Sequence, residues 1–275
     1  MEAVPEEYEK FRPRIFPQYI KDTIDRHFPL MDWTDDDVIL DIGCGQGKST
    51  KQILLPKCPK IKKIVAIDIV PNLLNYARSN YHDDKIEYKE QNIVDRIETE
   101  DIAKYDKIFS SYALNYIGDY NKLFGNISQV LKPGGYFCIL IAAKAPVYST
   151  LRDLAKHRDW RLYIKPEEVL ATIPPTHDWE DVGNDFRQFV SKFGLNAIES
   201  NYEIVDVPFT CREHFMRMME VVCPKQLFEG LSPEVRKRLW TQSENHFFKY
   251  GVRETEDEVI WPVGLLAACG QKRYS

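Results

Sequence analysis

The sequence predicts an α/β fold built on one mixed, mostly parallel sheet of seven strands. Five short apolar segments alternate with helix-compatible sequence over the first half of the 275-residue chain, as strands joined by helical crossovers do. Two further apolar segments in the second half complete the sheet. Ligands of such sheets bind beyond the carboxyl ends of the parallel strands. The loops that follow the strands are therefore the first places to look for a site.

The elements of the first half follow one another in a regular order. Apolar or alternating runs predict strands at 38–43, 63–69, 86–93, 105–114 and 136–143. Helices are expected from the glycine-rich turn to about Leu55, from Pro71, and from Tyr120 to the Pro-Gly-Gly stop at 133–135. This half, residues 36–143, is the expected ligand-binding half of the sheet.

The second half breaks the alternation. A helix is expected at 182–194, strands at 196–209 and 258–272, and more helix within 211–249. Because the last strand has the composition of a core strand, the chain is expected to form a single domain, 1–275. Cap helices are expected at 1–35, and two insertions, 144–182 and 210–257, are expected to cover the ligand edge.

Composition restricts the class of partner and the compartment. The net charge is −5 and no block of Lys or Arg occurs, so a nucleic-acid surface is not indicated. Six scattered cysteines without a C-x-x-C pair suit a reducing compartment and give no metal signature. The longest apolar stretch, 136–148, is interrupted by Lys144 and Pro146 and is too short to span a membrane. We therefore expect a cytoplasmic protein, and a homodimer is compatible with the sequence.

The stretch VILDIGCGQGKST, residues 38–50, fits three kinds of glycine-rich loop. A phosphate-binding P-loop needs glycine where Ile42 stands, so that loop would be one residue too short. A dinucleotide fingerprint needs glycine where Lys48 stands. The third pattern, acid-x-Gly-x-Gly-x-Gly, is complete from Asp41 to Gly47. Asp68, at the end of the next strand, is an acid that indicates a hydroxyl-bearing ribose, because a carboxylate can accept two O–H groups at once.

The Asp41–Gly47 run resembles motif I of the class I S-adenosylmethionine-dependent methyltransferases, which have a Rossmann-like fold. The resemblance implies that Gly43, Gly45 and Gly47 approach the amino-acid end of S-adenosylmethionine and that Asp68, followed by Ile69, holds its ribose. It also implies that Asp41 holds the ammonium group, directly or through water. The same run can form a strand-to-helix turn without a ligand, which the strands on both sides make less favoured.

Two later segments match the family less closely. Asn92 and Ile93 stand where an acid and an apolar residue flank the adenine in that family. The Asn92 carbonyl can accept from the adenine amine, although an asparagine is equally common in a turn. Ser110, in the segment FSSYALNYI after the fourth strand, is a candidate contact below the cofactor.

Four segments resemble the insect juvenile hormone acid O-methyltransferases, which methylate the carboxylate of farnesoic or juvenile hormone acid. They are YEKFRPRIFPQYIKD, YDKIFSSYALNY, AAKAPVYSTLRDLAKHRDWRLYI and VCPKQLFEGLSPEVRKRLW. In that family a glutamine and a tryptophan hold the carboxylate. Gln18 matches the glutamine. Tyr116 replaces the tryptophan, and Asn115 replaces the histidine that often precedes it, so the identity of the acid is left open. A solvated Gln18 and a core Tyr116 are the structural alternatives.

The resemblance implies carboxyl methylation, and the residues are consistent with it. A carboxylate with a pKa of roughly 4–5 is already ionised at neutral pH, and no obvious general base is present. A terpenoid chain would need an apolar pocket, for which the candidates are Tyr148, Trp160, Phe215, Met218, Met219 and Val222. Two other functions stay open. The acceptor could be a nitrogen, a phenol oxygen or an aconitate-like acid, or the fold could bind a ligand without catalysis.

Overall fold

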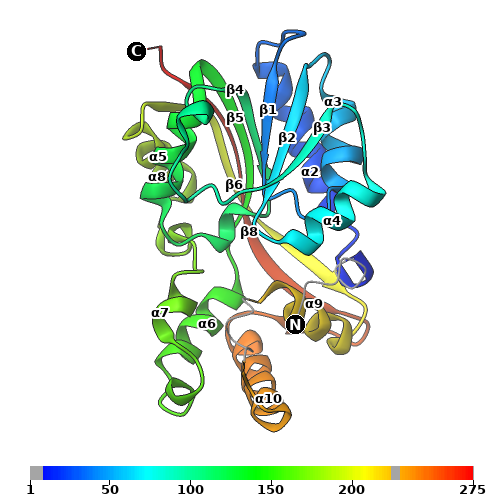
Figure 1. The fold of residues 1–275 in the computed structure, drawn as a ribbon. Coiled ribbons are helices and arrows are strands. Elements are labelled where there is room, and N and C mark those ends of the chain that lie inside the picture. The colour runs from blue at the N-terminus through cyan, green and yellow to red at the C-terminus, as the bar shows by residue number, and fades with distance from the viewer. Residues whose placement is uncertain (1–8, 224–229, 275) are drawn as a thin grey trace.

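The computed structural model describes residues 9–223 and 230–274, and its centre is the predicted mixed sheet (Figure 1). The strand order is β3-β2-β1-β4-β5-β8-β6, with the short β7 paired to β8. The first five strands run parallel and β8 is antiparallel to β5, β6 and β7. The strands are β1 Val38–Ile42, β2 Lys63–Asp68, β3 Ile86–Glu90, β4 Tyr105–Ser111, β5 Leu131–Lys144, β6 Leu195–Phe209, β7 Arg253–Glu254 and β8 Val259–Lys272.

Helices cover both faces of the sheet. One face packs on α2 (Phe16–His27), α4 (Pro71–Asn80) and the helix after β1, which runs through a π-helical segment, Thr50–Leu54, into α3 (Leu55–Lys57). The other face packs on α5 (Tyr120–Val130) and α8 (Val182–Ser191). Short 3-10 turns lie at Phe28–Leu30, Thr99–Asp101, Leu114–Tyr116, Trp160–Leu162 and Pro175–Asp178.

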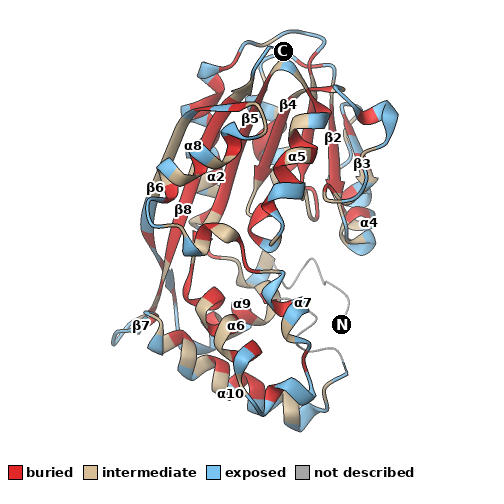
Figure 2. Cartoon of the chain, turned by 90° about the vertical axis from the view of Figure 1, so that its left-hand side faces the viewer, coloured by how far each residue is buried: buried red, intermediate tan, exposed pale blue. Residues whose placement is uncertain are grey.

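A cap of helices lies beyond the carboxyl ends of the parallel strands. It contains α6 (Pro146–Lys156), α7 (Pro166–Leu170), α9 (Arg212–Val222) and α10 (Pro233–Lys249). In Figures 1 and 2 these four helices gather at one end of the sheet, and the long strands β6 and β8 run down to them. The four helices fall within residues 144–182 and 210–257, and the covering of a ligand edge by these segments stays a prediction.

Several expected boundaries differ from the observed ones. The fourth strand ends at Ser111, because Tyr112 has a φ of +54°, which cannot continue a strand. The third strand ends at Glu90. The helix expected to reach the Pro-Gly-Gly stop ends at Val130, and 131–135 join β5 through an irregular register opposite Tyr105 and Lys107. Helix was expected across 211–249, and the structure forms two helices there, with 224–229 outside the described residues. Strand β7 was not predicted.

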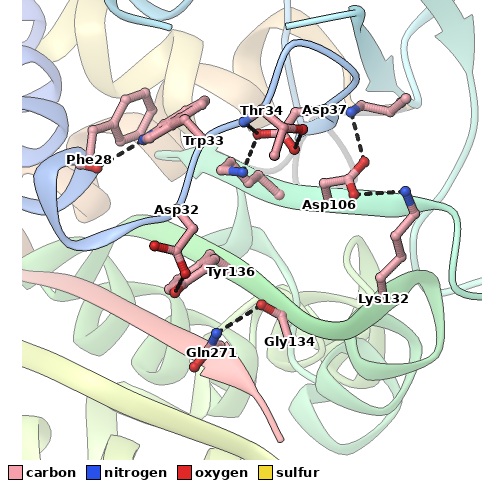
Figure 3. A network of polar contacts seen from close by, with 12 residues as sticks. Phe28, Asp32, Trp33, Thr34, Asp37, Asp106, Lys132, Gly134, Tyr136 and Gln271 are labelled. Carbon is pink, nitrogen blue, oxygen red and sulfur yellow. Dashed lines mark hydrogen bonds and ion pairs between the residues drawn. The ribbon is translucent and has the colours of Figure 1, made fainter. Parts of the chain in front are cut away.

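A polar network ties the opposite end of the sheet together (Figure 3). The carboxylate of Asp37 accepts hydrogen bonds from Thr34 and forms an ion pair with Lys107. Both side chains are buried, with 4 % of Asp37 and 5 % of Lys107 exposed. Asp106 accepts from the Val38 backbone at 2.9 Å and from Lys132 at 2.7 Å. This network closes the amino ends of β1 and β4, so only their carboxyl ends are left for a site.

The buried ion pair gives a stability test. Lys107→Met leaves Asp37 buried without its cation, and removing one partner of such a pair costs about 3–5 kcal/mol. We expect urea unfolding to show that the free energy of unfolding falls by about this amount. The double variant Asp37→Leu/Lys107→Met should recover much of it, because no charge stays buried. Lys60→Met, in an exposed pair with Asp35, is the control and should change stability by less than about 1 kcal/mol. A Lys107→Met loss as small as that of the control would contradict this account.

Candidate active site

The glycine-rich loop turns the chain out of β1. Gly43, Gly45 and Gly47 all have positive φ angles, +76°, +55° and +81°. A Cβ at Gly43 would lie 2.1 Å from the Cβ of Ala113, and one at Gly47 would lie 2.6 Å from the Tyr88 hydroxyl. These two glycines are therefore required by packing. A Cβ at Gly45 would meet nothing within 4 Å, so the loop is open to a ligand at this residue.

Asp68 lies beside the loop because β1 and β2 are parallel neighbours that end together. One carboxylate oxygen accepts from the Gly45 backbone N–H at 2.8 Å and the other from the Val70 N–H at 2.9 Å. Burial raises the pKa of Asp68, and these backbone donors oppose the rise. The carboxylate is thus held in one orientation at the sheet edge. The next side chain, Ile69, is 63 % exposed and offers an apolar surface beside it.

Asp41 lies deeper, at the end of β1. Its side chain is 4 % exposed, and it accepts a hydrogen bond from the Thr50 hydroxyl at 2.6 Å. Burial raises its pKa to about 7, while Thr50 opposes the shift and Asp68 adds to it. Its contact with Thr50 fixes the first turn of the helix after the loop. With so little exposure, direct contact of Asp41 with a ligand is restricted, and its role at an ammonium group stays a prediction.

The adenine-side candidates lie at the end of β3. The Asn92 carbonyl oxygen accepts from the Val94 N–H at 3.2 Å and its amide donates to Asp95 at 3.3 Å. This is the turn asparagine that the sequence left as an alternative, although a carbonyl oxygen can accept a second bond. Ile93 is buried. Ser110 is fully buried and donates to the Ile42 carbonyl at 2.8 Å, so its hydroxyl joins β4 to β1 instead of facing a ligand.

The segment after β4 connects the loop to a cavity. Ala113 packs against Gly43, while Tyr112, Asn115 and Tyr116, on either side of Ala113, line the cavity. Tyr112 adopts its positive φ here, and such strain is commonly found at functional sites. A group bound over the glycine loop would therefore lie next to whatever fills the cavity.

The cavity is lined by apolar and neutral polar residues from the sheet, α2 and the cap. They are Phe16, Tyr112, Asn115, Tyr116, Ala142, Val147, Tyr148, Leu151, Thr172, Met218, Val222, Trp261 and Val263. Among residues 9–223 and 230–274, no Asp, Glu, His, Lys or Arg belongs to this lining. Such a surface suits a ligand that is mostly hydrocarbon.

The structure brings together only part of the predicted site. Asn115, Tyr116 and Tyr148 meet at the cavity. Gln18 does not: it is exposed, and its amide donates to Asp22 at 2.7 Å. Trp160 lies at a separate surface hollow beside α10, where its indole N–H donates to Gln242. Phe215 and Met219 are fully buried in the core and are not in the lining.

Two aromatic residues of the lining, Phe16 and Trp261, were not predicted. Their rings lie 6.4 Å apart, and the Phe16 ring lies 5.0 Å from that of Tyr112. Each belongs to a segment with the pattern of a core element, so the sequence offers no local signal that sets it apart.

Comparison with known proteins places this fold and loop in one class. A methyltransferase-domain family model matches residues 34–184. The chain therefore belongs to the class I S-adenosylmethionine-dependent methyltransferases, and its cofactor is S-adenosylmethionine. The residues present fit this cofactor. The loop is open at Gly45, the fixed Asp68 carboxylate can accept from a ribose, and the exposed Ile69 offers an apolar surface to the edge of an adenine.

No helix among residues 9–223 and 230–274 is long and apolar enough to cross a membrane.

Similar proteins include juvenile hormone acid O-methyltransferases of two insects. The Drosophila melanogaster enzyme is 27 % identical over 186 residues, which are 66 % of this chain and 61 % of that protein. The Bombyx mori enzyme is 25 % identical over 64 % of this chain and 63 % of that protein. These matches thus span less than two thirds of the relatives' length. A putative methyltransferase from Bacillus halodurans has the same fold, with a TM-score of 0.58 at 14 % identity, covering 91 % of this chain and 98 % of that one.

The ribose assignment predicts a loss of cofactor affinity in Asp68→Ala. Hydrogen bonds to a charged group contribute about 1.5–3 kcal/mol each, so losing two should weaken S-adenosylhomocysteine binding at least about 100-fold by calorimetry. Asp35→Asn, at an exposed carboxylate, is the control and should bind normally. Unchanged affinity in a folded Asp68→Ala protein would rule out the ribose role.

The pKa of Asp41 predicts a pH-dependent stability. Because the folded-state pKa, about 7, lies above the ordinary 3.8, the folded protein binds more protons and loses stability as pH rises from about 4 to 7. In ligand-free protein, Asp41→Asn should remove this loss. The free energy of unfolding of Asp41→Asn minus that of the parent should rise by about 2–3 kcal/mol between pH 5 and pH 8, as measured by urea unfolding. A difference that does not change with pH would contradict the buried, protonated Asp41.

Proposed function

We propose that the protein methylates the carboxylate of a small, mostly apolar acid, giving a methyl ester. One observation carries the proposal: the described lining of the cavity contains no side chain suited to act as a general base near neutral pH. Burial holds the pKa of Tyr148 well above its usual value, so this phenol does not serve as one. A carboxylate needs no base because it is ionised at neutral pH.

The reaction then depends on alignment and on exclusion of water. S-adenosylmethionine supplies an electrophilic methyl group on a sulfonium. The glycine loop, Asp68 and Ile69 hold it on one side of the segment 112–116, with Asn92, Ile93 and Asp41 as further proposed contacts. On the other side the apolar cavity holds the acid. Fixing the two at near-attack distance would supply much of the rate. The oxygen–methyl bond of the ester would form as the sulfur–methyl bond breaks, so that the carboxylate and sulfonium charges cancel and S-adenosylhomocysteine leaves as a neutral thioether.

The carboxylate of the acid must be held by neutral donors in this cavity. Tyr116 lines the cavity and is 43 % exposed, and its phenol is a hydrogen-bond donor. An acid with one carboxylate fits this surface. A tricarboxylate such as aconitate would bring several charges to a lining without Lys or Arg among the described residues, which disfavours that rival.

The other rivals are disfavoured by different residues. A nitrogen or phenol acceptor must lose a proton, and His177, which packs on the Tyr148 ring, does not join the lining. A binding protein without catalysis would have no need of the open loop at Gly45 or the fixed Asp68. The similarity to juvenile hormone acid O-methyltransferases supports a farnesoic acid-like substrate. A cytoplasmic location, a homodimer and a role in juvenile hormone biosynthesis stay predictions.

A methyl-transfer screen tests the proposal. Fatty, terpenoid and tricarboxylic acids are compared with a phenol and an amine of similar size, and products are identified by mass spectrometry. We expect methyl esters of the fatty or terpenoid acids, with kcat nearly constant from pH 6 to pH 9 because no base titrates. Tyr116→Phe should lower kcat/KM roughly 10-fold, the effect of losing one hydrogen bond of about 1.4 kcal/mol.

Two outcomes would contradict the proposal. Methylation of the amine or phenol alone, with a rate that rises with pH, would assign a different acceptor. If Gln18→Ala lowers kcat/KM more than Tyr116→Phe does, the substrate carboxylate binds at α2 and not in the cavity, as the family resemblance implies.

A further inference from the structure

Two buried polar atoms of the cavity lining have no hydrogen-bond partner among the described residues. They are the indole Nε1 of Trp261 and the side-chain carbonyl Oδ1 of Asn115. Each residue is 5 % exposed. A buried polar atom without a partner is costly, so such atoms commonly mark the place of a ligand group. The two atoms have opposite character, because an indole N–H only donates and a carbonyl only accepts.

The orientation of the Asn115 amide follows from its neighbour Tyr148. The Tyr148 hydroxyl donates its single proton to the Ala142 carbonyl at 2.8 Å. Its oxygen can therefore only accept, and Asn115 is the side chain that donates to it. The NH₂ group of Asn115 is thus the end directed at Tyr148, and the carbonyl is the end left for another partner. Exchanging the two ends of the amide would place two acceptors against each other.

Within the part of the chain that the structure describes, no acceptor competes for the Trp261 N–H. Trp261 lies on β8 opposite Val207, and its indole packs among the rings of Phe16, Phe209 and Phe215. A ligand that brings an oxygen to this N–H offers a partner that these rings do not provide.

We propose, on the basis of carboxyl methylation, that the substrate is a hydroxy acid: Trp261 donates to its carboxylate, and Asn115 accepts from a hydroxyl on its chain. A plain fatty acid or farnesoic acid satisfies only Trp261, because its ionised carboxylate has no proton to donate. Asn115 therefore discriminates in favour of acids that carry a hydroxyl. A site built to bond a hydroxyl rejects the analogue without it.

A matched set of acids tests this selectivity. Dodecanoic acid is compared with its 2-, 3- and 12-hydroxy derivatives, and the ester formed is measured by mass spectrometry. At least one hydroxy isomer should have a kcat/KM roughly 10- to 100-fold above that of dodecanoic acid, as expected for filling a buried acceptor. Asn115→Leu should reduce this ratio to about 1.

Two variants serve as controls. Thr172 also lines the cavity, but its hydroxyl already donates to Val169 at 2.7 Å, so Thr172→Val should keep the hydroxy-acid ratio. Trp261→Phe keeps an aromatic ring without the N–H. It should lower kcat/KM for all the acids by a common factor, roughly 10-fold, and leave the ratio unchanged.

The outcomes separate this inference from the function on which it rests. If dodecanoic acid is methylated and no hydroxy isomer is preferred, hydroxyl recognition is wrong and carboxyl methylation stands. If none of the acids is methylated by protein that binds S-adenosylhomocysteine, both proposals fail. If Asn115→Leu keeps the ratio but weakens S-adenosylhomocysteine binding, the Asn115 carbonyl serves the cofactor and the inference is overturned. If Trp261→Phe has the same kcat/KM as the parent protein, the Trp261 indole does not bind the carboxylate.

Discussion

The hydrogen bond from the Gly45 backbone to the Asp68 carboxylate is the contact on which the site depends. It joins the ends of β1 and β2 and fixes both the open part of the loop and the acid beside it. The contact requires a positive φ at Gly45 and a buried carboxylate whose charge is supported by backbone N–H groups. The loop therefore needs little rearrangement to receive a cofactor, because its donors and acceptors are already in place.

The rest of the sheet is organised around this edge. Its amino end is closed by the Asp37–Lys107 pair and the bonds of Asp106 (Figure 3), while its carboxyl end carries the glycine loop and meets the cap. The segment 112–116 joins the two halves of the site: Ala113 packs on Gly43, and Tyr112, Asn115 and Tyr116 line the cavity. Under the proposed function, a methyl donor and its acceptor would lie on opposite sides of this short turn.

The sequence predicted the sheet and the loop well because both depend on local pattern. Apolar runs identify buried strands, and the spacing of Asp41, Gly43, Gly45 and Gly47 is contiguous. The cavity was predicted only in part. On α9 the lining residues are Met218 and Val222, while Met219, next to Met218, faces the core, a difference of one helical position that composition does not encode. Phe16 and Trp261 meet from opposite ends of the chain, so only the folded structure shows that they share a cavity.

A crystal structure with S-adenosylhomocysteine tests the central claim most directly. The account predicts both ribose hydroxyls within hydrogen-bond distance of the Asp68 carboxylate and the thioether sulfur beside 112–116, facing the cavity lined by Asn115 and Trp261. A ligand bound with its ribose away from Asp68, or with its sulfur directed to solvent instead of this cavity, would contradict it.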